Sequence, residues 1–498
     1  MEQFISMLDN FIWGPFMIVL MGMVAVYFSV SLKFPQIRLF KHLVSNTFGD
    51  RGKRDGISPF QSFSIALGGR VGTGTVTGTA GAILAGGPGA VFWMWLMALL
   101  GSATAFVESV FGQVYKKKIR DEYIGGPAFY IDAGLGWKKA AAVYAGVTAV
   151  FMLIFASVQS NAFSTIVKSN FRIPSWAIAI AYAVLLMMVI FGGAKKISRV
   201  AEIIVPFMTL GYILLALVMF VVKYNQIPQV FGMIFKSAFG VDAVFGGIVG
   251  NAISWGFKRG SLSHEAGQGT GAMVSGTSEV SHPAKSGFAQ AFSVIVTILI
   301  STATVFIIFS QKSFNVANPA SGFLQENVPG LSSGEFTSHA INGFLPGWGG
   351  MFISLAMFLF TFTTILAYSI YLESSTAYFL KEKAETNLLK KIMTVLNCVM
   401  IIMVIGGAFL SADLVWGMAS ICSGIVSIIN LVTIFCMRKQ AAIILKDYEK
   451  QVTAGINPVF IPSNCGIKHA ELWDEIIDER YSEEKDTYQK TFKNSQET

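Results

Sequence analysis

Glycine and threonine dominate one stretch of the sequence, LGGRVGTGTVTGTAGAILAGGPG, which covers residues 67–89. Nine of its 23 residues are glycine, and apolar runs flank it on both sides. Glycine costs a helix about 1 kcal/mol relative to alanine, so the stretch predicts a helix that is interrupted. Peptide N–H groups at the start of a half-helix can bind a carboxylate, and freed carbonyls can bind an ammonium group. Glycine suits this chemistry because a small solute can touch its backbone directly.

A second stretch, GGIVGNAISWGFKRGSLSHEAGQGTGAMVSG at residues 246–276, has the same richness in glycine, serine and threonine. It carries charge at Lys258, Arg259, His264 and Glu265, as the first stretch does at Arg70. An ionisable residue at membrane depth indicates a functional site. These groups are therefore candidates for a gate or an ion pair. For Glu265, direct contact with a ligand is an equal alternative.

Two further apolar runs contain neutral polar side chains. Thr363 and Thr364 are adjacent, and their oxygens together with carbonyls of the first break would suit a small hard cation. The alternative is that each hydroxyl bonds back to a carbonyl of its own helix. Gln159 and Asn161 lie in another run, where an amide offers a donor and an acceptor to a zwitterion. The alternative for these amides is a bond between two helices.

Other kinds of site fit these motifs poorly. GTGTVTG is close to a dinucleotide-binding loop, but the run that follows has no acidic residue, and a phosphate-binding loop would need Gly-Lys before Ser or Thr. His264 and Glu265 begin a zinc-protease motif, yet Gln268 stands where its second histidine is needed. Close helix packing through Gly74 and Gly78 is the plain alternative to a binding role. The four cysteines show no C-x-x-C pairing, so we expect free thiols, no organic cofactor and no metal except sodium.

The elements that carry these residues are membrane helices. Of the 498 residues, 53% are hydrophobic and 13% are charged, and the mean hydropathy is +0.58. A soluble domain could not bury that much apolar surface, so a lipid bilayer must be the solvent for most of the chain. The net charge of +8 does not indicate nucleic acid as a partner, because the basic residues stand beside apolar runs.

Eleven apolar segments are long enough to cross a bilayer, and the first has no features of a cleaved signal peptide. They are residues 12–32, 60–85, 90–114, 141–168, 174–193, 200–222, 243–272, 287–310, 346–375, 392–409 and 413–437. Lysine and arginine gather in alternate loops, whereas the long loop at 311–346 has a single lysine. This asymmetry predicts a multi-pass protein of a bacterial cell membrane, with the N-terminus outside and the C-terminus in the cytoplasm.

The two interrupted segments stand five spans apart. Interrupted helices at corresponding places in two halves indicate a transporter with its binding site at the membrane midplane. With the first span set aside, ten spans remain as five plus five, and an odd number per unit inverts the second unit. The predicted parts are an extra N-terminal helix and loop (1–59), a first repeat (60–225), a second repeat (226–437) and a cytoplasmic tail (438–498).

Four blocks of the sequence resemble the alanine or glycine:cation symporter family, also called the sodium:alanine symporters. They are RVGTGTVTGTAGAILAGGPGAVFWMW, GGPAFYI, GFKRGSLSHEAGQGTG and TFTTILAYSIYLE. The tail block NPVFIPSNCGIKHAELW is similar to amino-acid carrier proteins of Gram-positive type. The resemblance implies an all-α polytopic membrane protein with a leucine-transporter-type fold: 11 transmembrane helices, built as a 5+5 inverted repeat with one extra N-terminal helix.

The resemblance also implies which residues form the site. Those that would contact the substrate are Gly72, Thr73, Gly74, Thr75, Gln159 and Phe163. Those that would bind sodium are Gly68, Val71, Thr363 and Thr364. Two positions depart from the family pattern, because Thr75 and His264 each stand where asparagine is common. The first departure puts the amino-acid preference in question, and the second could bring pH sensitivity.

The function implied by the resemblance is that of a symporter and not of an enzyme. Inward flux of sodium, or of protons, would drive the uptake of a small neutral amino acid. Alanine and glycine are the first candidates, because close approach to a glycine backbone favours a small side chain, and serine and glutamine are the next. The alternative is an amino-acid-gated channel or sensor on the same scaffold.

Overall fold

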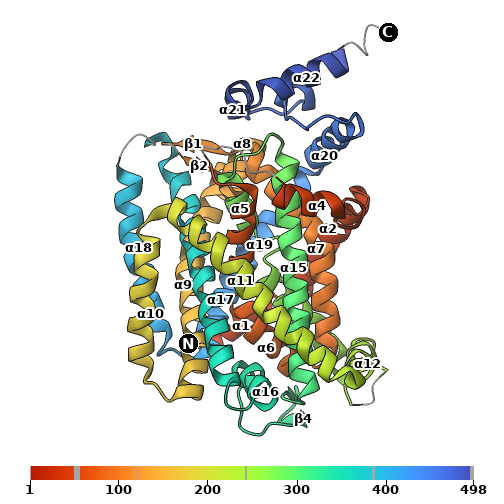
Figure 1. The fold of residues 1–498 in the computed structure, drawn as a ribbon, viewed down its shortest axis with the longest axis vertical. Coiled ribbons are helices and arrows are strands. Elements are labelled where there is room, and N and C mark those ends of the chain that lie inside the picture. Colours follow the sequence, from red (N-terminus) through yellow and green to blue (C-terminus); the bar gives the residue numbers. More distant parts are fainter. Residues whose placement is uncertain (1, 50–55, 121, 242–243, 384–386, 494–498) are drawn as a thin grey trace.

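The computed structural model is mostly helical and describes all residues except 1, 50–55, 121, 242–243, 384–386 and 494–498 (Figure 1). The basic residues expected in the loop at 50–55 therefore lie outside the described residues. Within the described part, eight helical segments are long and apolar enough to cross a membrane. They are Gln3–Ser31 (α1, Glu2–Ile12, with α2, Pro15–Ser31), α7 (Gly89–Val114), α9 (Lys138–Phe171), α11 (Gly193–Val222), α15 (Pro283–Ser310), α17 (Gly349–Leu380), α18 (Leu388–Gly407) and α19 (Ala412–Cys436).

The remaining three predicted spans differ from these eight. One is α10 (Ser175–Ile190), an apolar helix of 16 residues. The other two are the interrupted segments, neither of which forms a continuous long helix. The first predicted span also has a joint, because α1 ends at Ile12 and α2 begins at Pro15. Proline fits the first turn of a helix but lacks the N–H that would continue one.

The first interrupted segment consists of α5 (Pro59–Arg70), a π-helical turn (Gly74–Gly78) and α6 (Thr79–Gly86). Its start is well defined, since Ser58 and Gln61 form a capping box at the N-terminus of α5. The α-helix stops at Arg70, and Val71 and Gly72 separate it from the π-helical turn. The interruption thus falls where the glycine content predicts it.

The second interrupted segment consists of a 3-10 turn (Gly246–Ile248), α13 (Val249–His264) and α14 (Thr270–Thr277). Three residues between α13 and α14 have left-handed backbone: Glu265 at φ 53°, Gly267 at φ 90° and Gly269 at φ 88°. A left-handed residue directly after a helix ends the helical hydrogen-bond pattern. Peptide groups of this break must therefore find other partners.

The connections carry short elements that correct the all-α prediction. Two hairpins are present, β1 with β2 and β3 with β4. The connecting elements are α3 (Pro35–Arg38), α4 (Phe40–Phe48), β1 (Lys117–Ile119), β2 (Glu122–Ile124), α8 (Pro127–Leu135), α12 (Ile227–Ala238), β3 (Asn315–Ala317), β4 (Phe323–Glu326), α16 (Phe336–Phe344), and the 3-10 turns Tyr224–Gln226, Ser333–Glu335 and Lys381–Lys383. Strands this short were missed because three or four residues give no alternating pattern.

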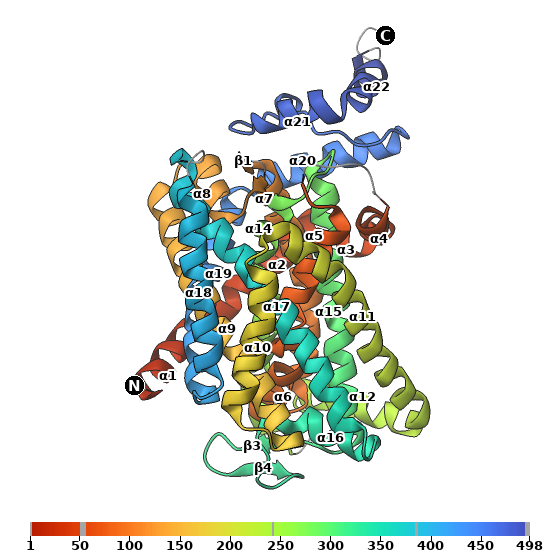
Figure 2. The ribbon, with the colours of Figure 1, turned by 60° about the vertical axis from the view of Figure 1, so that its left-hand side comes forward.

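The long helices form one bundle in which α9 packs along α17 and α7 along α15 (Figure 2). The β3–β4 hairpin and α16 lie at one end, and β1, β2 and α8 lie at the other (Figure 1). Beyond that second end stands the described part of the tail (residues 438–493), made of α20 (Arg438–Thr453), a 3-10 turn (Pro462–Cys465), α21 (Leu472–Arg480) and α22 (Ser482–Lys493).

The tail docks on the bundle, and its largest buried side chain there is Trp473. Trp473 of α21 is 0% exposed, and its Nε1 donates to the carbonyl of Gln113 in α7 at 3.0 Å. Nearby, the N–H of Phe460 donates to the carbonyl of Ser281 at 2.9 Å. The sequence of residues 472–477 is weakly amphipathic and is compatible with packing on the membrane face, packing on the protein or a loosely ordered tail. The structure shows that this segment packs on the protein.

Candidate functional site

The interruption between Arg70 and Gly74 is called the first break, and that between His264 and Thr270 the second break. Gln159 of α9 accepts a hydrogen bond from a peptide group of the first break. The N–H of Val71 still bonds to the carbonyl of Leu67 at 2.8 Å, whereas the N–H of Thr73 donates to Oε1 of Gln159 at 3.0 Å. Gln159 is 1% exposed, so this bond takes the place of water. A side chain thus satisfies one of the peptide groups that the sequence assigns to the substrate.

Gly72 lies where a side chain would not fit. A Cβ atom on Gly72 would lie 2.5 Å from Oγ1 of Thr364 and 2.6 Å from Oε1 of Gln159. Glycine is therefore required for α9 and α17 to approach the break this closely. Gly74 has the same role toward the second break, since its Cβ would lie 2.8 Å from Cα of Ser263.

Oxygen atoms of α5 and α17 gather beside the first break. Oγ1 of Thr364 lies 2.7 Å from the carbonyl oxygen of Gly68 and 2.8 Å from that of Phe360. Oγ1 of Thr363 bonds back to Leu359 at 2.9 Å, and a Cβ on Gly68 would lie 3.3 Å from it. Thr364 thus reaches across to the interrupted helix, while Thr363 bonds within its own helix beside it.

Val71 and the threonines of the break add further oxygens. Oγ1 of Thr75 donates to the carbonyl of Val71 at 3.1 Å and lies 3.3 Å from the carbonyl oxygen of Gly72. Thr75 therefore contacts carbonyls that the break has freed. Oγ1 of Thr73 is buried without a hydrogen-bond partner among the described residues, which leaves it available to a ligand.

Tyr368, Phe155 and Trp416 form a row of packed rings that begins at Gln159 and is called the aromatic wall. The sequence analysis did not identify it. The hydroxyl of Tyr368 in α17 accepts from Nε2 of Gln159 at 3.1 Å, which directs Oε1 toward the break. The Tyr368 ring stacks on Phe155 with centroids 5.3 Å apart, and Phe155 meets Trp416 of α19 edge-on at 6.0 Å. Aromatic residues are frequent in apolar helices, so composition alone could not single these out.

Two other side chains of α9 have different surroundings. The ring of Phe163 packs against the rings of Tyr182 and Phe358, with centroids 4.9 and 5.8 Å away. The amide of Asn161 donates to the carbonyls of Gly407 and Leu410 at 3.0 and 2.8 Å. Asn161 thus joins α9 to the end of α18, which is the helix-to-helix alternative.

Glu265 and His264 are interior groups of the second break. Oε2 of Glu265 accepts from Thr270 at 2.7 Å and from Tyr371 of α17 at 3.3 Å. Nδ1 of His264 lies 2.5 Å from Oγ1 of Thr297 in α15. The two side chains are 2% and 1% exposed, so neither extends toward a membrane surface.

Arg70 joins the first break to the second. Its Nη1 donates to the backbone carbonyl of Gln290 at 3.2 Å, to the Oε1 of that residue at 3.3 Å, and to Ser293. Its Nη2 lies against α14, because a Cβ on Gly271 would be 2.5 Å away. With the contact of Gly74 described above and the bond from Oγ of Ser62 to the carbonyl of Val274 at 3.2 Å, the two interrupted segments touch at several points.

Lys258 and Arg259 line a cavity of about 750 Å³ whose walls come from α1, α13 and the start of α19. Lys258 forms an ion pair with Asp9 of α1. The guanidinium of Arg259 lies over the Trp416 ring at 4.3 Å. Arg259 therefore stands between this cavity and the aromatic wall of the site.

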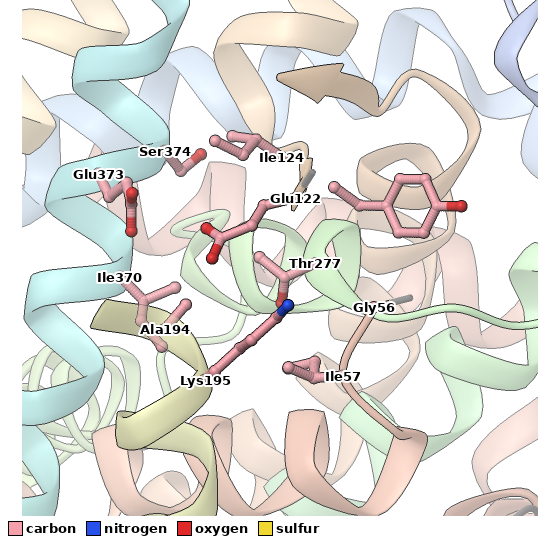
Figure 3. Close-up of a pocket in the computed structure, with 11 residues that line it drawn as sticks. Gly56, Ile57, Glu122, Ile124, Ala194, Lys195, Thr277, Ile370, Glu373 and Ser374 are labelled. Carbon is pink, nitrogen blue, oxygen red and sulfur yellow. The ribbon is translucent and has the colours of Figure 1, made fainter. Parts of the chain in front are cut away.

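A smaller cavity of about 30 Å³ lies near the tail, between β2 and the ends of α14 and α17 (Figure 3). Figure 3 shows Glu122, Lys195 and Glu373 around it. A further cavity of about 820 Å³ lies between α8 and the tail, with Asp132, Lys381 and His469 among its lining residues. The described bundle thus has a large cavity beside α1 and another at its tail-facing end.

Glu108 of α7 is a further interior residue that the sequence analysis missed. Its Oε2 accepts from the N–H groups of Gly267 and Gly269 at 3.2 and 3.1 Å, and from Nδ2 of Asn430 in α19 at 2.9 Å. Glu108 thereby satisfies peptide groups of the second break. The available signal was a lone carboxylate inside the apolar run at 90–114.

These features define the class of protein. Two interrupted helices lie among long apolar helices, and their peptide groups bond to buried side chains, as in membrane transporters. A solved structure of MhsT in complex with L-phenylalanine has the same fold, with a TM-score of 0.52 and 13% sequence identity over 86% of this chain and 96% of that chain. The likeness shows the leucine-transporter-type fold that the resemblance implied.

The chain belongs to the Sodium:alanine symporter family, whose sequence model matches residues 1–462. The sodium/proton-dependent alanine carrier protein of Bacillus sp. (strain PS3) is 39% identical over 84% of this chain and 94% of its own length. The amino-acid carrier protein AlsT of Bacillus subtilis (strain 168) is 36% identical over 95% and 99%. The predicted family is confirmed. The protein is thus a cation-coupled amino-acid symporter of the plasma membrane and, as predicted, not an enzyme.

Proposed function

We propose that this symporter uses an inward sodium gradient to take up a small neutral amino acid. Alanine and glycine are the first candidates, serine and glutamine are the next, and a proton is the alternative coupling ion. The observation that carries the proposal is the peptide N–H of Thr73, which has left the helical pattern and is held by the buried amide of Gln159.

The first break suits the two charges of an amino acid. The substrate carboxylate would displace Oε1 of Gln159 from the N–H of Thr73 and lie at the positive end of the following half-helix. The displaced oxygen of Gln159 would then accept a hydrogen bond from the substrate ammonium group. Because a Cβ atom does not fit at Gly72, the substrate must lie in a narrow space, which favours alanine and glycine.

Sodium would bind between α5 and α17. Its ligands would be the carbonyl oxygens of Gly68 and Val71 and the hydroxyls of Thr363 and Thr364, since neutral and carbonyl oxygens suit a hard cation. The hydroxyl of Thr364 donates to the carbonyl of Gly68, so sodium binding would replace this hydrogen bond by coordination of both oxygens to the ion. One charge moving down 100 mV yields roughly 2.3 kcal/mol, about a 50-fold concentration ratio.

The proposed topology has 11 spans in a 5+5 inverted repeat. The 16-residue α10 and the two interrupted segments would join the eight long helices as spans. The repeats are residues 60–225 and 226–437, preceded by the extra helix and loop (1–59) and followed by the cytoplasmic tail (438–498). The basic loops support an outside N-terminus. Contacts between the interrupted segments, among them those at Gly74 and Gly271, support a common midplane site.

Access to the site would alternate between the two ends of the bundle. The cavity of about 750 Å³ beside α1 would be the outer entrance to the site, because Trp416 of the aromatic wall lines it. Arg259, over Trp416, would form the outer gate. The buried side chains of Arg70, His264 and Glu265 would make the interior contacts that change when the two interrupted segments move.

The proposal is tested by uptake of a labelled amino-acid panel into proteoliposomes, with a sodium gradient or with choline in its place. We expect sodium-dependent uptake of a small neutral amino acid. Thr364→Ala should abolish most of the sodium dependence. Thr376→Ala is the matched control on α17, because that hydroxyl bonds back to Leu372 at 2.7 Å. Equal uptake in choline would overturn the sodium assignment, and current far above the amino-acid flux would identify a channel.

A further inference from the structure

One face of α19 is polar along most of the helix. Trp416, Ser420, Ser423, Ser427 and Asn430 follow one another at intervals of four, three, four and three residues, which places them on one side. The Trp416 end meets the aromatic wall of the site, and the Asn430 end bonds to α7. The polar face therefore points into the protein and not into lipid.

The three serines of this face, Ser420, Ser423 and Ser427, share one state. Each is at most 2% exposed, and none of their hydroxyls has a hydrogen-bond partner among the described residues. A hydroxyl in a helix commonly bonds back to a carbonyl one turn earlier, as Thr433 on another face of α19 does to Ile429 at 2.8 Å. Buried polar groups without a protein partner are sites for ordered water. Ser420, Ser423 and Ser427 thus form a row along the helix, called the α19 file, whose hydroxyls can hydrogen-bond water molecules and pass a proton between them.

The file connects a cavity with a buried carboxylate. At one end, Ser420 lines the cavity of about 750 Å³ beside α1, together with the charged groups of Asp9, Lys258 and Asp413. At the other end, Nδ2 of Asn430 donates to Glu108 at 2.9 Å. The serines bridge the distance between these ends on the same face of one helix.

Glu108 has one oxygen available for a proton. Its Oε2 already accepts from Gly267, Gly269 and Asn430, at 3.2, 3.1 and 2.9 Å. Its Oε1 is buried and has no hydrogen-bond partner among the described residues. A proton would therefore bind at Oε1 and leave the three N–H bonds to Oε2 in place.

The charged groups around Glu108 have an excess negative charge, which one bound cation would neutralise. The charged and titratable groups that face it or its neighbours are Arg70 of α5, His264 and Glu265 of the second break, Tyr130 of α8 and Tyr144 of α9. Arg70 is one cation facing two carboxylates, those of Glu108 and Glu265. An excess negative charge inside a membrane protein is costly. One proton on Glu108 restores the balance.

We propose that Glu108 binds a proton that reaches it from the cavity beside α1 along the α19 file, and that this proton is a second coupling ion beside sodium. In this step a water of the file gives a proton to Oε1 and takes one from the next water toward the cavity. One O–H bond breaks for each that forms, the net proton comes from the cavity, and the carboxylate becomes neutral. The inference rests on the proposed function, because it adds an ion to the same transport cycle. It assigns the proton and the sodium ion to different places, the second break and the first.

The test measures proton movement in proteoliposomes that contain a pH-sensitive dye and have their voltage clamped. In the wild type, addition of alanine under a sodium gradient should acidify the lumen in proportion to alanine uptake. Glu108→Gln keeps an oxygen for the N–H donors but takes up no proton. This variant should retain sodium-dependent uptake and lose the acidification.

A double-mutant cycle tests the file itself. Ser423→Val with Ser427→Val should slow alanine uptake at alkaline pH in the wild-type background, and a more acidic exterior should restore the rate. The same pair should have no effect in the Glu108→Gln background, where no proton needs to be delivered. Thr433→Val, on another face of α19, is the matched control and should change neither rate.

Each outcome decides the matter. If the wild type shows sodium-dependent uptake without acidification, or Glu108→Gln still acidifies the lumen, the inference is wrong while the proposed function stands. If the wild type shows no amino-acid uptake, the proposed function itself fails. If Glu108→Gln does not fold, the serine pair decides, because a rate that acid does not restore contradicts proton delivery along the file.

Discussion

The guanidinium of Arg70, the last residue of α5, lies directly against Gly271, the second residue of α14. A Cβ atom on Gly271 would lie 2.5 Å from Nη2 of Arg70, and Nη1 is held by Gln290 and Ser293. The end of one half-helix is therefore fitted to the start of the other. A movement of either interrupted segment must displace the arginine, which couples the two breaks mechanically.

Gly271→Ala should impair transport, because the new methyl group would collide with the held guanidinium. Overpacking of this kind costs about 1–3 kcal/mol, and we expect lower thermal stability together with a clear loss of uptake rate. Gly146→Ala in α9 is the control, since nothing lies within 4 Å of its added Cβ. Wild-type uptake and melting temperature in Gly271→Ala would contradict the tight fit of the two breaks.

Gln159→Leu should raise KM for the amino acid. The change removes the proposed acceptor of the substrate ammonium group, so that an N–H donor of the bound substrate is left buried without that partner. An unsatisfied buried polar group costs about 1–3 kcal/mol, which corresponds to a KM increase of about tenfold. Initial rates of uptake over a range of concentrations measure the effect.

Asn161→Leu provides the comparison for Gln159→Leu on the same helix. Its amide bonds to the end of α18 at Gly407 and Leu410. We expect reduced thermal stability with an almost unchanged KM. An equal rise of KM in both variants would show that Gln159 acts through helix packing and not through the substrate.

Trp473→Ala should release the tail from the bundle. The indole is 0% exposed and donates to Gln113, and replacing a buried tryptophan by alanine costs about 3–5 kcal/mol. Limited proteolysis should then cut the tail faster, while the membrane part stays intact. Trp348→Ala is the control, because that side chain is 68% exposed. Unchanged cleavage would contradict docking through Trp473.

Tail docking should also weaken at mildly acidic pH. Burial lowers the pKa of His282 below its ordinary value of 6.5, although Asp447 of the tail, 3.2 Å away, opposes the shift. The docked state therefore binds fewer protons than the undocked state. Docking is fully stabilised above pH 6.5 and weakens as the pH falls below it toward the lowered pKa.

Limited proteolysis between pH 7.5 and pH 5.5 would measure this dependence. His282→Asn keeps an acceptor for the N–H of Ala284 at the start of α15 but cannot titrate in this range. Its tail should be cut at a rate that depends less on pH than in the wild type. A stronger release of the wild-type tail at alkaline pH would reverse the predicted sign.

The sequence predicted the local features of the site and missed the long-range ones. The breaks could be predicted because glycine content acts locally, and Thr364 stood out as a polar residue in an apolar run. Tyr368 and Trp416 could not be assigned, because an aromatic residue is ordinary in such a run and its partner is distant in sequence. Glu108 gave a signal as a lone carboxylate, but its partners in the second break follow from packing.

The contacts of the tail and of the joint between α1 and α2 are also long-range and could not be predicted from local sequence. The tail is polar and mixed in charge, and its short amphipathic segment at 472–477 did not indicate which surface Trp473 would meet. The first apolar run gave one continuous span, whereas Pro15 starts a separate helix and Asp9 of α1 pairs with Lys258. Such pairings depend on which segments meet in space, which local composition does not specify.

The central claim is that peptide groups and hydroxyls freed at the first break hold a cation and an amino acid together. Binding of radioactive sodium to the purified protein, with and without alanine, tests this most directly. We predict that alanine increases the affinity for sodium in the wild type and in the Thr376→Ala variant. The Thr364→Ala variant should not show this increase. Sodium binding that alanine does not change, or that survives in full in Thr364→Ala, would contradict this claim.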